Sequence, residues 1–250
     1  MEPLYHIGFD DSHGAKYAIL PGDPGRVEKI AQFLDAPQFH HQNREYTTWI
    51  GKIHGERVLV MSHGIGGAST AIAVEELYQT GVRTFVRVGT CGGMAEQVIG
   101  GDLVVATSAI RQDGTSKEYV PIEFPAVADL EVTNALVQGA KTLGLTYHVG
   151  VVQCKDSFYG QHSPDRMPIG YELKEKWQAW IRAGCLASEM ESATLYIVAA
   201  YLGARAGCIL STVWNQERAA RGLDNPECHD TTPAIQAAVE ALRILIDAQK

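Results

Sequence analysis

The fold is decided by one stretch of sequence, Arg83-Thr84-Phe85-Val86-Arg87-Val88-Gly89-Thr90-Cys91-Gly92-Gly93. Its first half is rich in β-branched and aromatic residues, which predicts a buried strand. The strand is expected to break at Gly89, where glycines let the backbone turn tightly and approach a ligand. Arg87 is a permanent cation in this apolar run, and a buried guanidinium needs an anionic partner. The sequence therefore predicts that Arg87 faces either a bound oxyanion or a structural carboxylate.

Composition and charge exclude several classes of protein. The chain has 250 residues with ordinary globular composition, and its net charge of −8 argues against nucleic acid as a partner. No apolar run reaches the roughly 18 residues of a membrane helix, and the first residues lack the features of a signal peptide. We therefore expect no membrane partner and a cytoplasmic location. Five scattered cysteines without a C-x-x-C pair predict reduced thiols, and the adjacent Cys228 and His229 are too few for a metal site.

Strand-like and helix-like segments alternate along the whole chain without a break in composition or a repeat. This alternation predicts one α/β domain over residues 1–250, with a mixed sheet covered by helices on both faces. Ligands in such folds gather outside the strand ends. Strands are expected at 18–20, 47–53, 57–61, 84–88, 103–107, 147–153 and 208–213, and helices after Val27, up to Tyr78, and at 130–143, 193–202 and 232–248.

A second arginine, Arg26, follows a rigid turn that contains Gly22 and Asp23. The helix predicted after this turn offers backbone N–H groups to an anion, and a cation there is unfavourable unless an anion lies between them. The alternative is that Arg26 points into solvent. The segment 62–70 superficially resembles a dinucleotide-binding loop, but Ser69 replaces its third glycine, so a nicotinamide-dependent oxidoreductase is not expected.

The segment 154–166 is expected to be a loop. Its aromatic residues, Gln161 and Arg166 suit a flat polar ligand, because aromatic rings stack on such a ligand while the amide and the cation bind its edge. An exposed loop with incidental polar residues is the alternative.

The segment 187–192 opens a largely apolar helix. Ser188 and Glu191 have the spacing of a capping box, which would explain Glu191 by structure alone. Glu189 heads a helix that is expected to be buried, although acidic residues are favourable at any helix start.

Four motifs in this order resemble the nucleoside phosphorylase-I family, and the resemblance extends from about His6 to the C-terminal helix. The resemblance implies a partly barrel-like sheet and an enzyme in which phosphate attacks the anomeric carbon of a ribonucleoside, with inorganic phosphate as co-substrate and no cofactor. The closest likeness is to bacterial members that cleave uridine in pyrimidine salvage. The motifs are residues 20–26, 44–49, 87–93 and 189–194.

The resemblance also implies residue roles. The expected phosphate site is Gly22, Arg26, Arg44, Arg87 and Thr90, with Arg44 reaching into a neighbouring subunit. The expected nucleoside site is His6 (lent by the partner subunit), Thr90, Phe158, Gln161, Arg166, Glu189, Met190 and Glu191. Of these residues, catalysis is assigned to Arg87, Glu191, Gln161 and Arg166. A hexamer built as a trimer of dimers is implied, with K⁺ between subunits at Glu45, Ile65 and Ser69 in some members.

The choice of base depends on Gln161 and Arg166. Members that cleave uridine bind uracil with a Gln and an Arg, but the closest bacterial members place the Arg two residues after the Gln, whereas Arg166 follows five residues later. Arg218 is an alternative. Asn215 stands where purine-specific relatives carry an acidic Asp, which argues against purines. A purine nucleoside phosphorylase, a nucleoside hydrolase of the same fold and a non-catalytic nucleoside-binding protein remain the alternatives.

Overall fold

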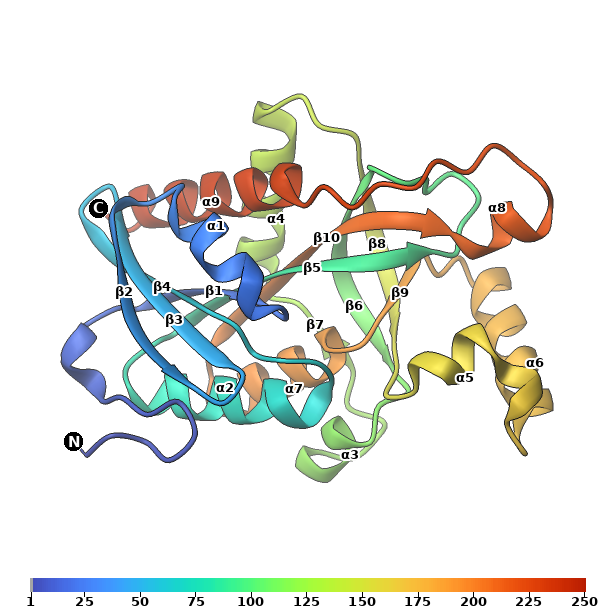
Figure 1. Ribbon diagram of the computed structural model, residues 1–250, viewed down its shortest axis with the longest axis horizontal. Helices are drawn as coiled ribbons and strands as arrows, with labels where there is room; N and C mark the ends of the chain where they lie inside the picture. Colours follow the sequence, from blue (N-terminus) through green and yellow to red (C-terminus); the bar gives the residue numbers. More distant parts are fainter. Residues whose placement is uncertain (1) are drawn as a thin grey trace.

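The computed structural model describes residues 2–250, and its strands form one ten-stranded mixed sheet (Figure 1). The strand order is β10-β6-β8-β9-β5-β1-β4-β3-β2, with β7 paired to β6. The strands are β1 Tyr17–Pro21, β2 Asp35–Asn43, β3 Tyr46–Ile53, β4 Glu56–Met61, β5 Thr84–Gly93, β6 Leu103–Arg111, β7 Ala126–Val127, β8 Tyr147–Cys154, β9 Ala187–Glu189 and β10 Arg205–Asn215.

Part of this sheet is closed. Strand β10 pairs with β6 on one side and with β5 on the other, so β10, β6, β8, β9 and β5 form a ring of five paired strands. The remaining strands extend from β5 as an open sheet that ends at β2. The predicted α/β fold with a mixed, partly barrel-like sheet is confirmed.

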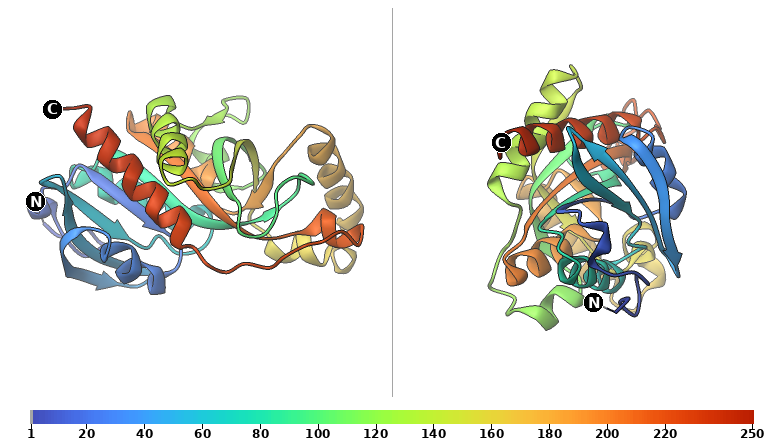
Figure 2. Two further views of the ribbon diagram at one scale, coloured as in Figure 1. Left: turned by 90° about the horizontal axis from the view of Figure 1, so that it is seen from above. Right: turned by 90° about the vertical axis from the view of Figure 1, so that its left-hand side faces the viewer.

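Helices cover both faces of the sheet (Figure 1). Helices α1, α4 and α9 lie on one face, and α4 packs along α9 (Figure 2). Helices α2, α3 and α7 lie on the other face, and α5, α6 and α8 gather at one end of the molecule. The helices are α1 Val27–Ala31, α2 Gly67–Gln79, α3 Thr115–Tyr119, α4 Leu130–Thr142, α5 Phe158–His162, α6 Gly170–Arg182, α7 Ser192–Leu202, α8 Gln216–Ala220 and α9 Thr232–Asp247, with 3₁₀ turns at Asp11–His13, Pro24–Arg26 and Pro164–Arg166.

Alternate side chains of the central strands enter two separate hydrophobic cores. Ala18 and Leu20 of β1 pack on the α2 and α7 face, whereas Tyr17 and Ile19 pack on the α4 and α9 face. Successive strand side chains point to opposite faces, so a strand covered by helices on both sides must be apolar throughout. Within residues 2–250, no helix combines the length and the apolar character needed to cross a bilayer.

The parallel strands at the centre of the sheet create the functional edge of the molecule. Strand β1 runs parallel to β4 and β5, and β5 runs parallel to β10. Their carboxyl ends therefore meet at one edge, as ligand sites in α/β proteins require. The turn after β1, the loop between β4 and α2 and the second half of β5 all lie at this edge.

Strand β5 does not break at its glycines, so that expectation was wrong. It continues to Gly93 because Gly89 and Thr90 stay paired with Leu210 and Ser211 of β10. Gly89 is needed for space, since a Cβ there would lie 2.8 Å from one terminal nitrogen of Arg87.

Several further elements differ from the sequence-based expectations, including the short α3, β7, β9 and α8, which were not predicted. The segment 154–166 is not a loop: Ser157 caps the short helix α5 by accepting a hydrogen bond of 2.9 Å from the N–H of Gly160. Strand β2 and helix α6 were not predicted. Both are largely exposed, and β2 shows no alternation of apolar and polar residues because it is an edge strand.

Candidate active site

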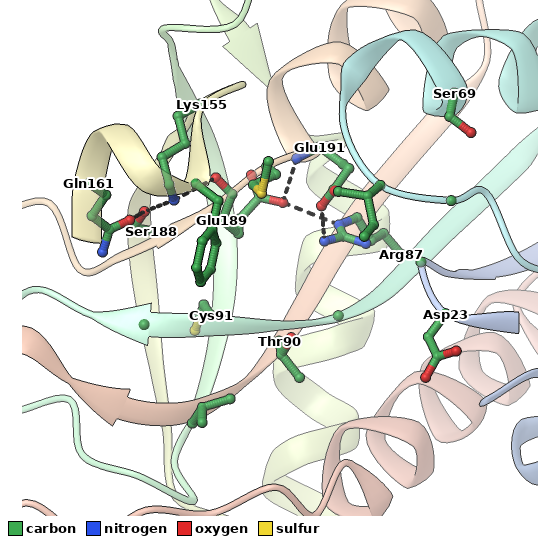
Figure 3. Close-up of a pocket in the computed structure, with 18 of the residues that line it drawn as sticks. Asp23, Ser69, Arg87, Thr90, Cys91, Lys155, Gln161, Ser188, Glu189 and Glu191 are labelled. Carbon is green, nitrogen blue, oxygen red and sulfur yellow. Dashed lines mark hydrogen bonds and ion pairs between the residues drawn. The ribbon is translucent and has the colours of Figure 1, made fainter. Parts of the chain in front are cut away.

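One cavity of about 790 Å³ opens at the carboxyl ends of the central strands. Its volume suits a small-molecule ligand. Figure 3 shows ten of its residues by name, and they come from segments far apart in the chain. The lining consists of Gly22, Asp23, Pro24, Arg26, Glu45, Gly64, Ile65, Ser69, Arg87, Gly89, Thr90, Cys91, Gly92, Lys155, Phe158, Gln161, His162, Ser188, Glu189, Met190, Glu191, Val213 and Trp214.

Arg87 lies at the centre of this cavity and has three partners. Its Nε donates to Glu189 at 3.2 Å, and one terminal nitrogen donates to Glu191 (Figure 3). The other terminal nitrogen contacts the ring of His63 at 2.8 Å. Although burial lowers the pKa of Arg87, the carboxylates of Glu191 and Glu189 raise it above its usual value. A guanidinium has five N–H groups, so two remain for a ligand. Both predicted alternatives therefore meet here: Arg87 is paired with carboxylates, and it also lines the cavity.

Glu189 and Glu191, at the start of α7, accept hydrogen bonds from different groups. Glu189 accepts hydrogen bonds from the backbone N–H groups of Glu191 at 2.9 Å and Ser192 at 3.0 Å, so it caps the helix. Glu191 accepts from the N–H of Gly66 at 2.7 Å and from Arg87. The predicted capping box of Ser188 and Glu191 is wrong, because Ser188 lies in β9.

The two carboxyl groups share one guanidinium, and their pKa values move apart. Burial raises the pKa of Glu189, but the charge of Arg87 and the hydrogen bonds at the start of α7 outweigh it and hold the pKa below its usual range. Burial and the neighbouring charge of Glu189 raise the pKa of Glu191 despite the contact with Arg87. Glu189 is therefore the permanent anion of the pair, and Glu191 is the group that more readily takes up a proton.

His63 contacts a terminal nitrogen of Arg87 and was not predicted from the sequence as a site residue. It is completely buried, and burial together with the charge of Arg87 holds its pKa well below the usual value. The ring is therefore neutral, so its Nε2 accepts from Arg87 while its Nδ1 donates to the hydroxyl of Thr70 at 3.0 Å. The pattern of segment 62–70 points to its glycines, and a lone histidine in such a segment carries no functional signal of its own.

Two arginines, Arg26 and Arg87, line the cavity. Arg26 follows the turn after β1, where its Nε lies 3.7 Å from the carboxylate of Asp23. Burial is the main reason that the pKa of Arg26 is lowered, and the nearby charge of Arg87 lowers it further. Two cations that face one cavity disfavour each other, and an anion between them would relieve this repulsion. Gly22 and Thr90 line the same region.

The opposite end of the cavity carries a network of amides. Gln161 donates to Gln216 at 3.0 Å. It also accepts from the hydroxyl of Ser188 at 2.8 Å (Figure 3). Ser188 also contacts Gln153 at 2.5 Å and receives a hydrogen bond from Lys155. This network fixes the amide plane of Gln161 and leaves one N–H and one lone pair of that amide for a ligand. Phe158 lies beside it and is half exposed.

Several residues assigned from the sequence lie outside this lining. The ring of His6 contacts Glu76 at 2.5 Å, and the exposed Arg44 lies over the ring of Tyr5. Arg166 is exposed in the 3₁₀ turn after α5. The structure thus brings together Gly22, Arg26, Arg87, Thr90, Phe158, Gln161, Glu189, Met190 and Glu191, but not His6, Arg44 or Arg166.

Arg218 and Asn215 are committed to the protein itself. Arg218 donates to the carbonyl oxygens of Asp224 at 2.6 Å and Glu96 at 2.9 Å. The amide of Asn215 donates to two backbone carbonyls and accepts from the N–H of Arg218. Neither residue belongs to the lining of the cavity.

Glu45, Ile65 and Ser69 form one rim of the cavity. Ser69 donates to Glu45 at 2.8 Å, and the side chain of Ile65 is exposed. Within residues 2–250, no group of three His, Cys, Asp or Glu side chains is arranged to hold a metal ion.

The sequence model of the family described as "Phosphorylase superfamily" matches residues 16–248, and the chain belongs to this family. The chain is 53% identical over 242 residues to the uridine phosphorylase of Treponema pallidum (strain Nichols), covering 97% of this chain and 94% of that protein. It is 44% identical over 250 residues to the uridine phosphorylase of Escherichia coli (strain K12), covering 97% and 98%. It is also 40% identical over 210 residues to the guanosine phosphorylase of Halorubrum lacusprofundi, covering 84% and 83%. The predicted family and the prediction that the chain is an enzyme of this type are confirmed.

Proposed function

We propose that this protein is a uridine phosphorylase, which converts uridine and phosphate reversibly into uracil and ribose 1-phosphate. One observation carries the proposal: a single cavity joins a pair of arginines at one end to an oriented amide and an aromatic ring at the other. In Figure 3, Gln161 lies on one side of the Arg87–Glu191 pair and Asp23 on the other. The similarity to uridine phosphorylases over nearly the whole chain supports the same activity.

The arginine end is proposed to hold phosphate against the sugar. Arg26 and Arg87 bind its oxygens as charge-assisted forks, and Gly22 and Thr90 complete the site. The two N–H groups of Arg87 that its protein partners leave unused are available for this contact. A phosphate oxygen attacks the anomeric carbon as the bond from that carbon to the base nitrogen breaks.

Glu191 and Met190 are proposed to hold the ribose between the two ends, next to Glu189. Glu191 is fixed by Gly66 and Arg87, so its carboxylate is oriented before the nucleoside binds. A carboxylate at this place stabilises the positive charge that develops on the sugar. Thr90 contributes to both the phosphate site and the nucleoside site.

The amide end is proposed to bind uracil. Phe158 stacks on the ring, and the free N–H and carbonyl of Gln161 match the alternating carbonyl and N–H edge of a pyrimidine. Both N–H groups of the Asn215 amide donate to backbone carbonyls, and an amide is not an acid that could protonate a purine. Arg166 was expected from the sequence to bind the base as well, but it is exposed and lies outside the lining of the cavity.

We also propose that the site is completed in a hexamer built as a trimer of dimers. His6 and Arg44 lie outside the cavity of their own chain, and this supports roles in the cavity of a neighbouring subunit. Glu45, Ile65 and Ser69 are proposed to hold K⁺ at such an interface, since Glu45 and Ser69 present oxygen ligands side by side. The proposed compartment is the cytoplasm, on the grounds of composition and the free cysteines.

Base release distinguishes this function from its alternatives. The protein is incubated with uridine, thymidine or inosine, with and without phosphate, and the free base is quantified by chromatography. Uracil that appears only with phosphate is the expected result. Base release without phosphate would indicate a hydrolase, release from inosine alone would indicate a purine enzyme, and binding without release would refute an enzymatic role.

A further inference from the structure

Lys155 is a buried cation at the amide end of the cavity to which neither the sequence motifs nor the proposed mechanism assigns a role. Its side chain follows β8, lines the cavity and is 6% exposed. Its Nζ donates to the hydroxyl of Ser188 at 2.5 Å and lies 3.5 Å from the carbonyl oxygen of Glu189 (Figure 3). The hydroxyl of Ser188 in turn contacts Gln161. Lys155 therefore belongs to the same network as the amide that faces the base.

The partners of this ammonium group are unusual for a buried lysine. Within residues 2–250, both hydrogen-bond partners of Nζ are neutral. The nearby carboxylates of Glu189 and Glu191 form their ion pairs with Arg87 and not with Lys155. A buried charge without a direct counter-ion is unfavourable. Burial accordingly lowers the pKa of Lys155, although the more distant charge of Glu189 opposes the shift. An ammonium has three N–H groups, so a ligand in the cavity can satisfy one that the protein leaves unsatisfied.

We propose that Lys155 binds a carbonyl oxygen of the pyrimidine and stabilises the negative charge of the departing base. This inference rests on the proposed phosphorolysis and assigns to Lys155 the catalytic role that the sequence gave to Arg166. Within residues 2–250, the Lys and Arg side chains that line the cavity are Arg26, Arg87 and Lys155, and of these Lys155 shares the hydroxyl of Ser188 with Gln161. Arg166 is exposed, and Arg218 is bonded to backbone carbonyls.

The charges and protons of this step balance. As the bond between the anomeric carbon and N1 breaks, its electron pair moves to N1 and is shared with the two carbonyl oxygens of uracil. The ammonium of Lys155 donates a hydrogen bond to one of these oxygens and keeps its proton. Hydrogen phosphate loses its own proton when it becomes the ribose ester, and one proton is then available for N1 of uracil. No further acid is consumed.

A purely structural role is the main competing explanation. Lys155 and Arg87 together match the two negative charges of Glu189 and Glu191, so the lysine would only balance the buried charge. The two explanations differ in their dependence on the leaving group. A charge-balancing lysine affects all nucleosides alike, whereas a lysine that stabilises the departing base matters less when the base is intrinsically more acidic.

The test compares uridine with 5-fluorouridine in Lys155→Met. The electron-withdrawing fluorine makes the departing base a better leaving group, so it needs less stabilisation. We expect kcat/KM for uridine to fall about a hundredfold, as for loss of one preorganised donor, and the loss for 5-fluorouridine to be at least about tenfold smaller. The KM for phosphate should stay within about twofold of wild type, and Lys155→Arg should recover part of the loss because it keeps a cation.

The matched control is Lys174→Met. Lys174 is an exposed lysine of α6 that pairs with Asp165 in the preceding 3₁₀ turn. This variant should leave both substrates unaffected. Equal losses for uridine and 5-fluorouridine in Lys155→Met would overturn the inference and leave the proposed function intact. If the wild-type protein releases no uracil, the proposed function itself fails. Should Lys155→Met not fold, Ser188→Ala carries the same comparison, because it removes the hydroxyl that holds Nζ.

Discussion

Replacing Arg87 with methionine should destabilise the fold as well as abolish turnover. Arg87 is the shared counter-ion of Glu189 and Glu191, and all three side chains are at most 7% exposed. Removing one partner of a buried ion pair costs about 3–5 kcal/mol, a large part of the roughly 5–15 kcal/mol that stabilises a typical domain. Glu189 keeps its backbone donors at the start of α7, whereas Glu191 keeps only the N–H of Gly66. The penalty should therefore fall mainly on Glu191.

This reasoning fixes the sign of a pH dependence. The pKa of Glu191 is already raised, and removal of the guanidinium raises it further. A carboxyl group whose pKa is higher in the folded state stabilises the fold at low pH, and this contribution is lost as pH rises through the folded-state pKa. The deficit of Arg87→Met relative to wild type should therefore shrink as pH falls from neutral to about 5.

Urea unfolding monitored by tryptophan fluorescence measures this deficit. The double variant Arg87→Met/Glu191→Gln should recover about 1–3 kcal/mol relative to the sum of the two single variants, without recovering uracil release. Arg83→Met is the matched control, because Arg83 is exposed and, within residues 2–250, its guanidinium donates to the backbone carbonyls of Tyr78 and Val82 and lies over the ring of Tyr78, with no carboxylate partner. Wild-type stability of Arg87→Met at neutral pH, or strictly additive effects in the double variant, would refute the reasoning.

Three further predictions follow from other side chains. His63→Leu removes the acceptor of one Arg87 nitrogen. The KM for phosphate should therefore rise about tenfold in steady-state assays, and the unfolding free energy should fall by about 1–3 kcal/mol. An unchanged KM would contradict a positioning role for His63. Arg166→Ala and Arg218→Ala should change kcat/KM for uridine by less than about threefold, and a hundredfold loss in either variant would return base recognition to that arginine. Burial lowers the pKa of His13 to about 4. The contribution of His13 to the unfolding free energy of the wild type should therefore be complete above about pH 6.5, and up to about 3 kcal/mol should be lost as pH drops through 4. His13→Gln should flatten this pH dependence of the urea midpoint, and an unchanged profile would exclude His13 as its source.

The sequence alone identified most of the elements that form the sheet and its two cores. Strands such as β1, β5 and β10 are continuous apolar runs, and α4 and α9 show helical periodicity, so local patterns were sufficient to predict them. The exposed β2 escaped because its weak burial leaves little periodic signal, whereas α6 carries apolar residues at helical spacing and was missed although that signal is present. The phosphorylase motifs correctly predicted the family.

Only the tertiary structure decided which polar side chains meet. The capping box of Ser188 and Glu191 satisfied a local rule, yet pairing of β9 with β5 and β8 keeps Ser188 in a strand and sends its hydroxyl to Gln161 and Lys155. His63 reaches Arg87 because parallel pairing of β1 with both β4 and β5 brings the ends of these two strands together. Such contacts join residues that are far apart in the chain. Their partners are set by strand register and barrel closure, which no local sequence pattern encodes.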